Sequence, residues 1–258
     1  MRKRLLWKKG SPFFLLFFIL VMWELLVAQL NVESWLLPSP SVIFETGIAE
    51  YERIVEHVTS TVQLAFIGLI IGSLIGIVLA TCLHLFPFIK EAVYPLLILS
   101  QNIPIIVLAP LLIIWFGFGI ESKLVVISLV CFFPISVSML DGLRQIPSEF
   151  SHYFEMMGAN KIQLFWKLEL PYALPSMFSG LKISATYSVM GAVISEWLGA
   201  QKGLGVYMTL ASSAYRTDRV FVAIFLIMFI SILFFVIITL LEKSLISWKR
   251  KEENSKNA

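Results

Sequence analysis

Charge is scarce in this 258-residue chain, and it is unevenly placed. Only 14% of the residues are charged, whereas 58% are hydrophobic, a balance too apolar for an ordinary soluble domain. Three stretches contain no Asp, Glu, Lys or Arg: Val58–Ile89, Ala92–Ile120 and Val220–Leu241. Each is longer than the roughly 20 residues that a helix needs to cross about 30 Å of hydrocarbon. The scarcity of charge therefore excludes a soluble globular protein and predicts membrane-spanning helices.

Cysteine and histidine are also rare, with two and three copies. Cys82 and Cys131 lie inside expected spans, where the ordinary role of a thiol is packing. His57, His84 and His152 are scattered, and none has a second ligand at helical spacing. We therefore expect no disulfide and no metal site.

Sequence motifs for nucleotide binding and catalysis are missing as well. The chain has no Gly-x-x-x-x-Gly-Lys-Ser/Thr phosphate loop, so if ATP drives this protein, the nucleotide must bind another polypeptide. It also lacks the nucleophile–base set or metal cluster that a membrane enzyme would need. We expect no catalytic residue and no cofactor bound by this chain.

The apolar segments predict an all-α polytopic membrane protein with six transmembrane helices, because a helix satisfies its own backbone hydrogen bonds in lipid. The spans are expected at residues 12–30, 58–89, 92–120, 124–140, 172–197 and 220–241. Together they form a single transmembrane domain, residues 1–258, with a core of about 57–242. Residues 1–30 could instead be a signal peptide, but Leu26–Leu30 offers no small-x-small cleavage site. We expect a retained first helix.

Basic residues gather on one side of the expected spans. If the N-terminus is cytoplasmic, fourteen Lys and Arg fall on the cytoplasmic side and five on the other, with Lys182 inside a span. This positive-inside bias places both termini in the cytoplasm. The net charge of +3 thus reflects topology, and we expect no nucleic-acid partner. The polar residues after Ser247 are expected to form a solvated, partly disordered tail.

A polar loop at about residues 144–171 lies between the fourth and fifth expected spans. Gly158 suits a helix C-terminus, where the chain turns through a left-handed conformation. Asn160 followed by Gln163 forms a capping-box pattern, and Pro171 is expected to end the second helix. Two short helices joined at a glycine predict a docking surface. An amphipathic pair resting on lipid would explain the aromatic residues of the loop but not this spacing.

These residues resemble the cytoplasmic loop of ABC importer permease subunits, in which a glycine precedes a Leu-x-Leu-Pro segment. Here Gly158 is followed, after nine residues, by Leu168–Pro171. The resemblance continues through three further segments: Ser179–Lys182, Glu196–Ala200 and Gly203–Gly205. Within that superfamily the chain is similar to the branch for nitrate, sulfonates, taurine and pyrimidine precursors of thiamine. The family's Glu-Ala-Ala falls on His152–Phe154, so only the glycine and Leu-Pro half of the motif is present.

The resemblance implies an ABC type I importer permease fold in the cytoplasmic (inner) membrane. It implies that the loop couples the permease to an ATPase through six residues: Glu155, Gly158, Ala159, Asn160, Leu168 and Pro171. The implied partners are a second permease copy in a homodimer, a cytoplasmic ABC ATPase dimer that binds ATP and Mg, and an extracytoplasmic substrate-binding protein. The binding protein would dock on a surface that includes Gly199–Arg219.

Small and polar residues inside the spans suggest packing contacts and a transport route. Gly68, Gly72 and Gly76 recur every four residues, a spacing that allows another helix to approach closely, either within one subunit or between subunits. Six residues are candidates for the translocation path: Gln101, Asn102, Pro104, Ser184, Ser188 and Glu196. The alternatives are a structural kink for the first three, helix packing for the serines, and a gate or helix cap for Glu196. Lys182 is expected to extend its amine to the cytoplasmic surface, and Glu24 to bind a neighbouring helix.

The preferred function is therefore the permease subunit of an ATP-driven importer for a small hydrophilic solute. The stretch Lys182–Met208 looks most like permeases for a pyrimidine precursor of thiamine. The same role for aliphatic sulfonates, taurine or nitrate is the alternative. An ion-coupled secondary carrier is a more distant one, because it would need paired charges inside the membrane.

Overall fold

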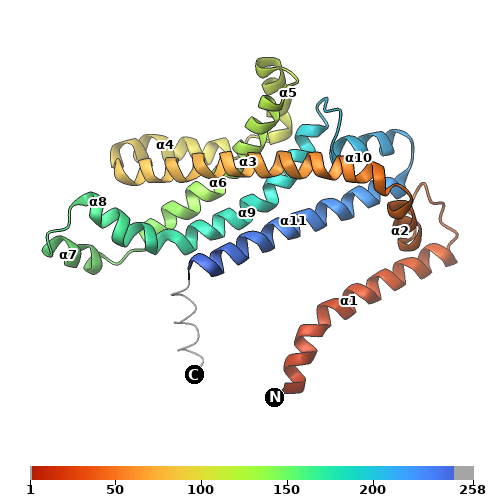
Figure 1. Ribbon diagram of the computed structural model, residues 1–258, viewed down its shortest axis with the longest axis horizontal. Helices are drawn as coiled ribbons and strands as arrows, with labels where there is room; N and C mark the ends of the chain where they lie inside the picture. Colours follow the sequence, from red (N-terminus) through yellow and green to blue (C-terminus); the bar gives the residue numbers. More distant parts are fainter. Residues whose placement is uncertain (1, 247–258) are drawn as a thin grey trace.

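The computed structural model describes the backbone of residues 2–246 and the side chains of residues 14–246. The tail expected after Ser247 lies outside the described residues. Every regular element within the described part is helical (Figure 1). The elements are α1 (Arg2–Gln29), α2 (Pro40–Ala49), α3 (Tyr51–Leu85), α4 (Pro87–Ser100), α5 (Ile105–Phe116), α6 (Ile120–Arg144), α7 (Ser148–Met156), α8 (Lys161–Leu164), the π-helical turn η1 (Phe165–Glu169), α9 (Leu170–Glu196), α10 (Leu204–Ser213) and α11 (Thr217–Leu245).

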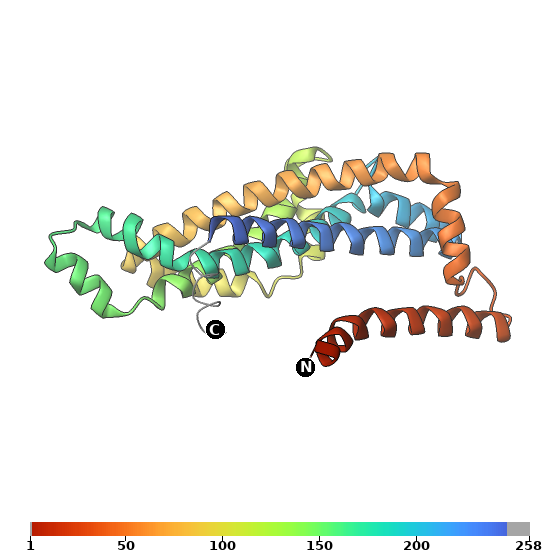
Figure 2. The same cartoon turned by 60° about the horizontal axis from the view of Figure 1, so that its bottom comes forward.

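Four long helices run side by side and form the bundle: α3, α6, α9 and α11 (Figures 1 and 2). Each is long and apolar enough to cross a membrane, the span of α9 being counted from Lys161. They correspond to the second, fourth, fifth and sixth expected spans. The short helices α7 and α8 lie at one end of the bundle, and α2 and α10 at the other (Figure 1).

The first expected span is α1, which lies apart from most of the bundle (Figure 2). It meets the rest of the protein near its C-terminal end, where the Trp23 ring packs 5.4 Å from that of Phe221. Glu24 accepts hydrogen bonds from the Ser41 amide (3.0 Å) and hydroxyl (2.7 Å), so it binds the start of α2, as expected for a helix-binding acid. The count of six spans and the side on which the termini lie stay predictions.

The third expected span, residues 92–120, is broken at Gln101, Asn102 and Pro104, the residues for which a structural kink was the alternative. It consists of α4 and α5, which meet at an angle of 103°. Pro104, the N-cap of α5, has no N–H and disfavours a helical conformation in Ile103 before it. The amides of Gln101 and Asn102 bond only to carbonyls three residues back, at 3.3 and 3.1 Å. The helix therefore ends at the residues that the sequence marks as polar.

The core of the bundle is the contact between α6 and α9, in which small residues let the two backbones approach closely. A Cβ atom on Gly180 would lie 2.5 Å from the Pro134 carbonyl oxygen, and one on Gly142 would lie 2.7 Å from the Ser176 Cβ. Between membrane helices, close packing replaces the hydrophobic driving force that water supplies to soluble proteins. The small residues of α9 are thus the reason that it lies at the centre.

The row of glycines on α3 faces α6 of the same chain. Cβ atoms on Gly68, Gly72 and Gly76 would lie 2.4 Å from the Ile127 Cγ2, 2.6 Å from the Cys131 Cβ and 2.7 Å from the Phe132 carbonyl oxygen, respectively. Of the two interpretations of this row, the geometry corresponds to a contact within one subunit.

Candidate functional site

The segment that projects beyond the bundle consists of α7, α8 and η1, residues 148–169, which we call the elbow (Figure 1). Its bend follows from the local sequence. Gly158 has a φ of +80°, and its N–H donates to the Glu155 carbonyl (2.9 Å) while the Ala159 N–H donates to the Phe154 carbonyl (3.0 Å). These two bonds form the Schellman motif that ends a helix at a left-handed glycine.

Directly after the bend, Asn160 starts the next helix. Its side-chain oxygen accepts from the Gln163 N–H (2.8 Å), and its own N–H donates to the Gln163 side chain (2.9 Å). The predicted capping box is therefore present. Both sides of the bend are fixed by bonds within the segment itself, so the elbow has a defined angle before any partner binds.

Pro171 does not end the second helix, and this expectation is wrong. The chain stays helical from Lys161 to Glu196, with Pro171 in the first turn of α9. A proline inside a helix removes one hydrogen bond and crowds the preceding turn. Here the backbone widens into the π-helical turn η1, in which the Leu170 N–H bonds to the Phe165 carbonyl five residues back. The elbow is thus continuous with the span that follows it.

The elbow carries an exposed apolar surface. Six large side chains are each more than half exposed: Phe150, Tyr153, Met156, Met157, Ile162 and Trp166. Glu155, Gly158 and Asn160 are exposed beside them, whereas Ala159 and Leu168 are half-buried. An apolar surface of this size, mixed with polar groups, marks a site of interaction with a protein or a membrane. Of the residues proposed from sequence for coupling, Glu155, Gly158, Ala159 and Asn160 lie at the bend, whereas Leu168 lies in η1 and Pro171 in the first turn of α9.

The residues proposed for a translocation path lie in three different places. Gln101, Asn102 and Pro104 are exposed at the break between α4 and α5. Ser184 and Ser188 are fully buried, and their hydroxyls donate to the carbonyls of Cys131 (2.6 Å) and Ala185 (2.9 Å). In this conformation the serines belong to the α6–α9 contact, so a role in the path would require that contact to open.

Glu196, the sixth candidate, lies at the end of α9 in a buried polar cluster and is only 2% exposed. Its carboxylate accepts from the Thr61 hydroxyl (2.7 Å) and from the Gly205 N–H (2.8 Å). The Thr61 oxygen in turn accepts from the Leu204 N–H (2.8 Å). A carboxylate at the start of a helix accepts hydrogen bonds from the free N–H groups of the first turn, and its negative charge interacts favourably with the positive end of the helix dipole. Glu196 thus caps α10, one of the two roles considered for it.

The chain after Glu196 is shaped to fit this carboxylate. Gly203 has a φ of +130°, and a Cβ atom there would lie 2.1 Å from the Glu196 carboxyl carbon. The Gly203 N–H donates to the His57 Nδ1 at 3.1 Å. Sequence reasoning identified Glu196 and the glycines but missed His57 and Thr61, because these lie on α3, far away in the sequence.

Lys182 also has a partner on another helix. Its amine lies 2.5 Å from the Glu242 carboxylate on α11, and both side chains are mostly buried. The expectation that Lys182 extends to the cytoplasmic surface is therefore wrong. Pairing lowers the cost of burying each charge, and it fixes α11 against α9.

One face of α9 is exposed, with no partner among the residues that the structure describes. Its exposed residues follow one another at helical spacing: Ser179, Ile183, Thr186, Tyr187 and Met190. We call this set the α9 stripe. It lies on the opposite side from Ser184 and Ser188, which are buried against α6. Sequence reasoning selected the buried face because serine and glycine recur there every four residues.

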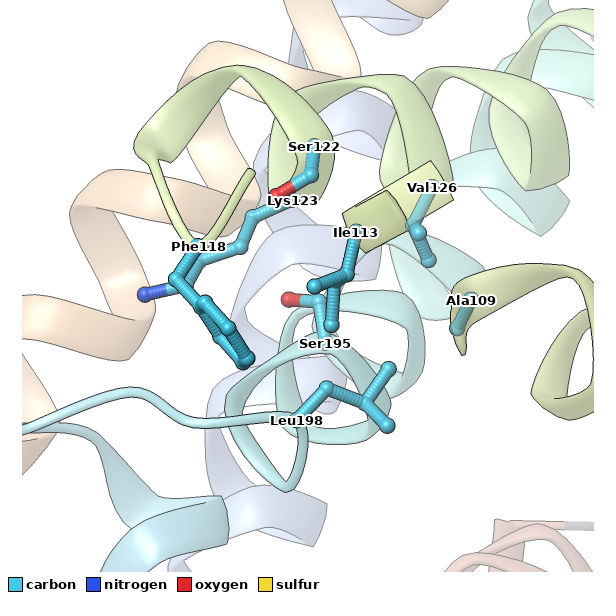
Figure 3. Close-up of a pocket in the computed structure, with 8 residues that line it drawn as sticks. All are labelled: Ala109, Ile113, Phe118, Ser122, Lys123, Val126, Ser195 and Leu198. Atoms are coloured by element: carbon cyan, nitrogen blue, oxygen red, sulfur yellow. The ribbon is translucent and has the colours of Figure 1, made fainter. Parts of the chain in front are cut away.

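Two cavities within the described part of the chain do not suit a hydrophilic solute. A cavity of about 10 Å³ between α5, α6 and the end of α9 is lined mainly by apolar side chains such as Ile113 and Leu198, with Ser122 and Ser195 among its polar residues (Figure 3). It has room for a single water molecule. A larger cavity of about 640 Å³ between α1, α2, α3 and α11 is lined mainly by apolar side chains such as Ile43 and Phe225. It offers few polar groups to orient a polar molecule.

Comparison with known proteins agrees with this architecture. Residues 68–247 match the family model described as "Binding-protein-dependent transport system inner membrane component". The formylaminopyrimidine transport permease protein ThiX of Halalkalibacterium halodurans is 38% identical over 92% of this chain and 96% of its own length. The riboflavin transport system permease protein RibX of Chloroflexus aurantiacus is 31% identical, covering 91% and 88% of the two chains. The taurine transport system permease protein TauC of Escherichia coli is 28% identical, covering 88% and 85%.

Two solved structures share the fold. A methionine ABC transporter matches 74% of this chain and 97% of its own, with a TM-score of 0.61 and 19% identity. An amino acid ABC transporter matches 78% and 98%, with a TM-score of 0.64 and 14% identity.

Proposed function

Because this chain belongs to the family of inner-membrane components of binding-protein-dependent transport systems, we propose that it is the permease through which an ABC importer moves a pyrimidine precursor of thiamine. The chain is a multi-pass transport subunit of the cytoplasmic membrane with the type I importer permease fold, and it is not itself an enzyme. Permeases of this family work with a separate ATPase and with a substrate-binding protein.

The observation that carries the proposed mechanism is the elbow. It holds a fixed bend, exposes six large apolar side chains, and continues without a break into the central span α9. A rigid projection of this kind can transmit a movement of its partner to the helix that follows it. We assign the elbow to the ATPase, which would hold ATP and Mg, with Glu155, Gly158, Ala159 and Asn160 at the contact.

The proposed substrate class is supported by similarity and by charge. The relative named for formylaminopyrimidine is 38% identical over almost the whole length of both chains. Nitrate, sulfonates and taurine each carry an anionic group that a free cation would stabilise in the membrane. Lys182, the lysine deep within α9, is already paired with Glu242. This pairing favours a heterocyclic solute without a strong negative charge.

A second copy of the chain is the proposed partner of the α9 stripe. A tyrosine hydroxyl such as that of Tyr187 seldom faces lipid in the middle of a membrane helix; it faces protein or water instead. Two copies related by a two-fold axis would bring the two stripes together and enclose a route between them. A homodimer therefore accounts for the face of α9 that the described part of the chain leaves exposed.

Uptake measurements in cells test the proposed function. Cells that carry the chain with its ATPase and binding protein should accumulate labelled formylaminopyrimidine, and unlabelled taurine, sulfonate or nitrate in excess should not compete. Accumulation should cease when ATP is depleted and persist when a protonophore collapses the ion gradient. Competition by taurine or sulfonate would show that the proposed substrate class is wrong. Dependence of uptake on the ion gradient would indicate a secondary carrier.

A further inference from the structure

The elbow contacts the bundle from the side at η1, next to the end of α3. Phe165 is the buried residue of this turn, with 6% exposure. It belongs to a core cluster that contains Leu83 of α3, Leu97 of α4 and Met139 of α6. The preceding helix α7, in contrast, has no buried residue. The apolar attachment of the elbow to its neighbours is therefore concentrated at one turn.

A polar contact lies beside this apolar one. The Nε2 atom of His84, the second-last residue of α3, is 2.9 Å from a carboxylate oxygen of Glu169, the last residue of η1. The two side chains are 21% and 15% exposed. The His84 ring also lies 6.2 Å from that of Phe165. A hydrogen bond shielded from water in this way is stronger than one at the surface.

The π-helical turn holds both contacts at a fixed spacing. Its closing hydrogen bond, from the Leu170 N–H to the Phe165 carbonyl, links the two ends of the segment that carries Phe165 and Glu169. The two side chains that meet α3 therefore belong to one rigid turn. The π-helical turn that accommodates Pro171 thus also presents the two side chains that meet α3.

The backbone connects the elbow directly to α6 and α9 but not to α3. The elbow continues into α9 and follows α6 after a short link, whereas α3 ends more than sixty residues before it. A movement of the elbow reaches α6 and α9 through the backbone. It reaches α3 indirectly, through the packing of α3 against α6 and α9, and directly through side chains of the elbow; within the described residues the hydrogen bond between the elbow and α3 is the one between Glu169 and His84.

We propose that His84 and Glu169 are positioning residues that make α3 follow the elbow when the ATPase moves it. This inference rests on the proposed function, because it needs an ATPase that acts on the elbow. Without the pair, α3 would still be held by its packing against α6 and α9, but its end at His84 would lag behind the elbow. ATP would then be hydrolysed with less transport per cycle.

Distance measurements between spin labels test this proposal. One label is placed on the exposed native Cys82, two residues before His84, with Cys131 replaced by Ala. The other is placed on a Glu149→Cys substitution in the first turn of α7; Glu149 is exposed and is not one of the six apolar side chains of the elbow. The complex with the ATPase is assembled with an excess of unlabelled, cysteine-free permease, so that each complex holds at most one labelled chain. In the otherwise native chain, a non-hydrolysable ATP analogue should leave the distance unchanged, because the elbow and α3 move together. In the His84→Leu variant, the same analogue should change the mean distance between the labels or broaden the distance distribution.

The controls separate the pair from a general effect on the end of α3. His84→Gln, which keeps a hydrogen-bond donor, should behave as the native chain does. Thr81→Val should too, because the hydroxyl of Thr81, also near the end of α3, donates to the Ile77 carbonyl of the same helix (2.8 Å), and Thr81 lies outside the elbow. In reconstituted vesicles, His84→Leu should still bind the ATPase but move at least about fivefold less formylaminopyrimidine per ATP hydrolysed.

Three outcomes would overturn the proposal: a nucleotide-dependent shift already present in the native chain, no shift in His84→Leu, or loss of ATPase binding in His84→Leu. Failure of the native chain to bind an ATPase would refute the proposed function instead. The two failures are therefore distinguishable in the same preparation.

Discussion

Two glycines of this chain share a left-handed backbone and open surroundings but differ in position. Gly158 has a φ of +80° and Gly117 a φ of +79°, and a Cβ atom on either would meet nothing within 4 Å. Valine should cost about 1–2 kcal/mol of backbone strain at Gly158, because its side chain crowds the following carbonyl, and about 1–3 kcal/mol at Gly117, whose ψ of −175° lies in a region that glycine alone adopts readily. Only Gly158 forms the bend of the elbow.

We therefore expect Gly158→Val to lower the amount of ATPase that copurifies with the permease, and Gly117→Val to leave it unchanged. Quantitative affinity purification of the two variants and the native complex measures this. Equal losses in both variants would mean that strain weakens the whole fold rather than the elbow surface.

Charged residues in the spans show why the role of a single residue depends on its partners. Lys182 and Glu196 are both costly to bury, which marks each as important. The structure gives them different roles, since Lys182 pairs with Glu242 on α11 while Glu196 caps α10. Neither role can be recognised from one helix alone.

At the scale of helices, the fold depends on the close approach of α3 and α6. A Cβ atom on Gly72 would lie 2.6 Å from the Cys131 Cβ, whereas one on Gly47 of α2 would lie 3.8 Å from Val222. Gly72→Ala should therefore push the helices apart and destabilise the fold by about 1–3 kcal/mol. Gly47→Ala should be neutral, or stabilising by up to about 1 kcal/mol through lower backbone entropy of the unfolded chain.

Thermal unfolding in detergent measures this difference. Cys131 is fully buried, so in a Cys82→Ser background its reaction with a thiol dye reports unfolding. The midpoint should fall for Gly72→Ala and not for Gly47→Ala. An unchanged midpoint for Gly72→Ala would show that α3 and α6 can separate at little cost.

At the scale of the whole molecule, the elbow and the α10 end must lie on opposite sides of the membrane. The two regions are at opposite ends of the bundle (Figure 1). Asn160 is exposed at the elbow, and Tyr215, which follows α10, is 75% exposed. A membrane-impermeant maleimide should react with Tyr215→Cys in intact cells, and with Asn160→Cys only after the membrane is opened. Labelling of Asn160→Cys in intact cells would show that the elbow faces the outside of the cell, where a cytoplasmic ATPase could not bind it.

The sequence alone determined the features that depend on neighbours in the chain. The apolar runs predicted four of the helices that now form the bundle, and the residues around Gly158 and Asn160 predicted a bend and a capping box that are both present. These features follow from hydrogen bonds and burial over a few residues, so the local sequence is sufficient to specify them.

Only the tertiary structure decided which residues meet across helices. It paired Lys182 with Glu242, placed His57 and Thr61 in the cluster around Glu196 and Gly203–Gly205, and joined the elbow to α3. It also turned the small residues of α9 inward and left the α9 stripe exposed. Contacts of this kind depend on how each helix is rotated and where it crosses its neighbours. The packing of all the helices together sets that rotation, and no single segment of the sequence contains it.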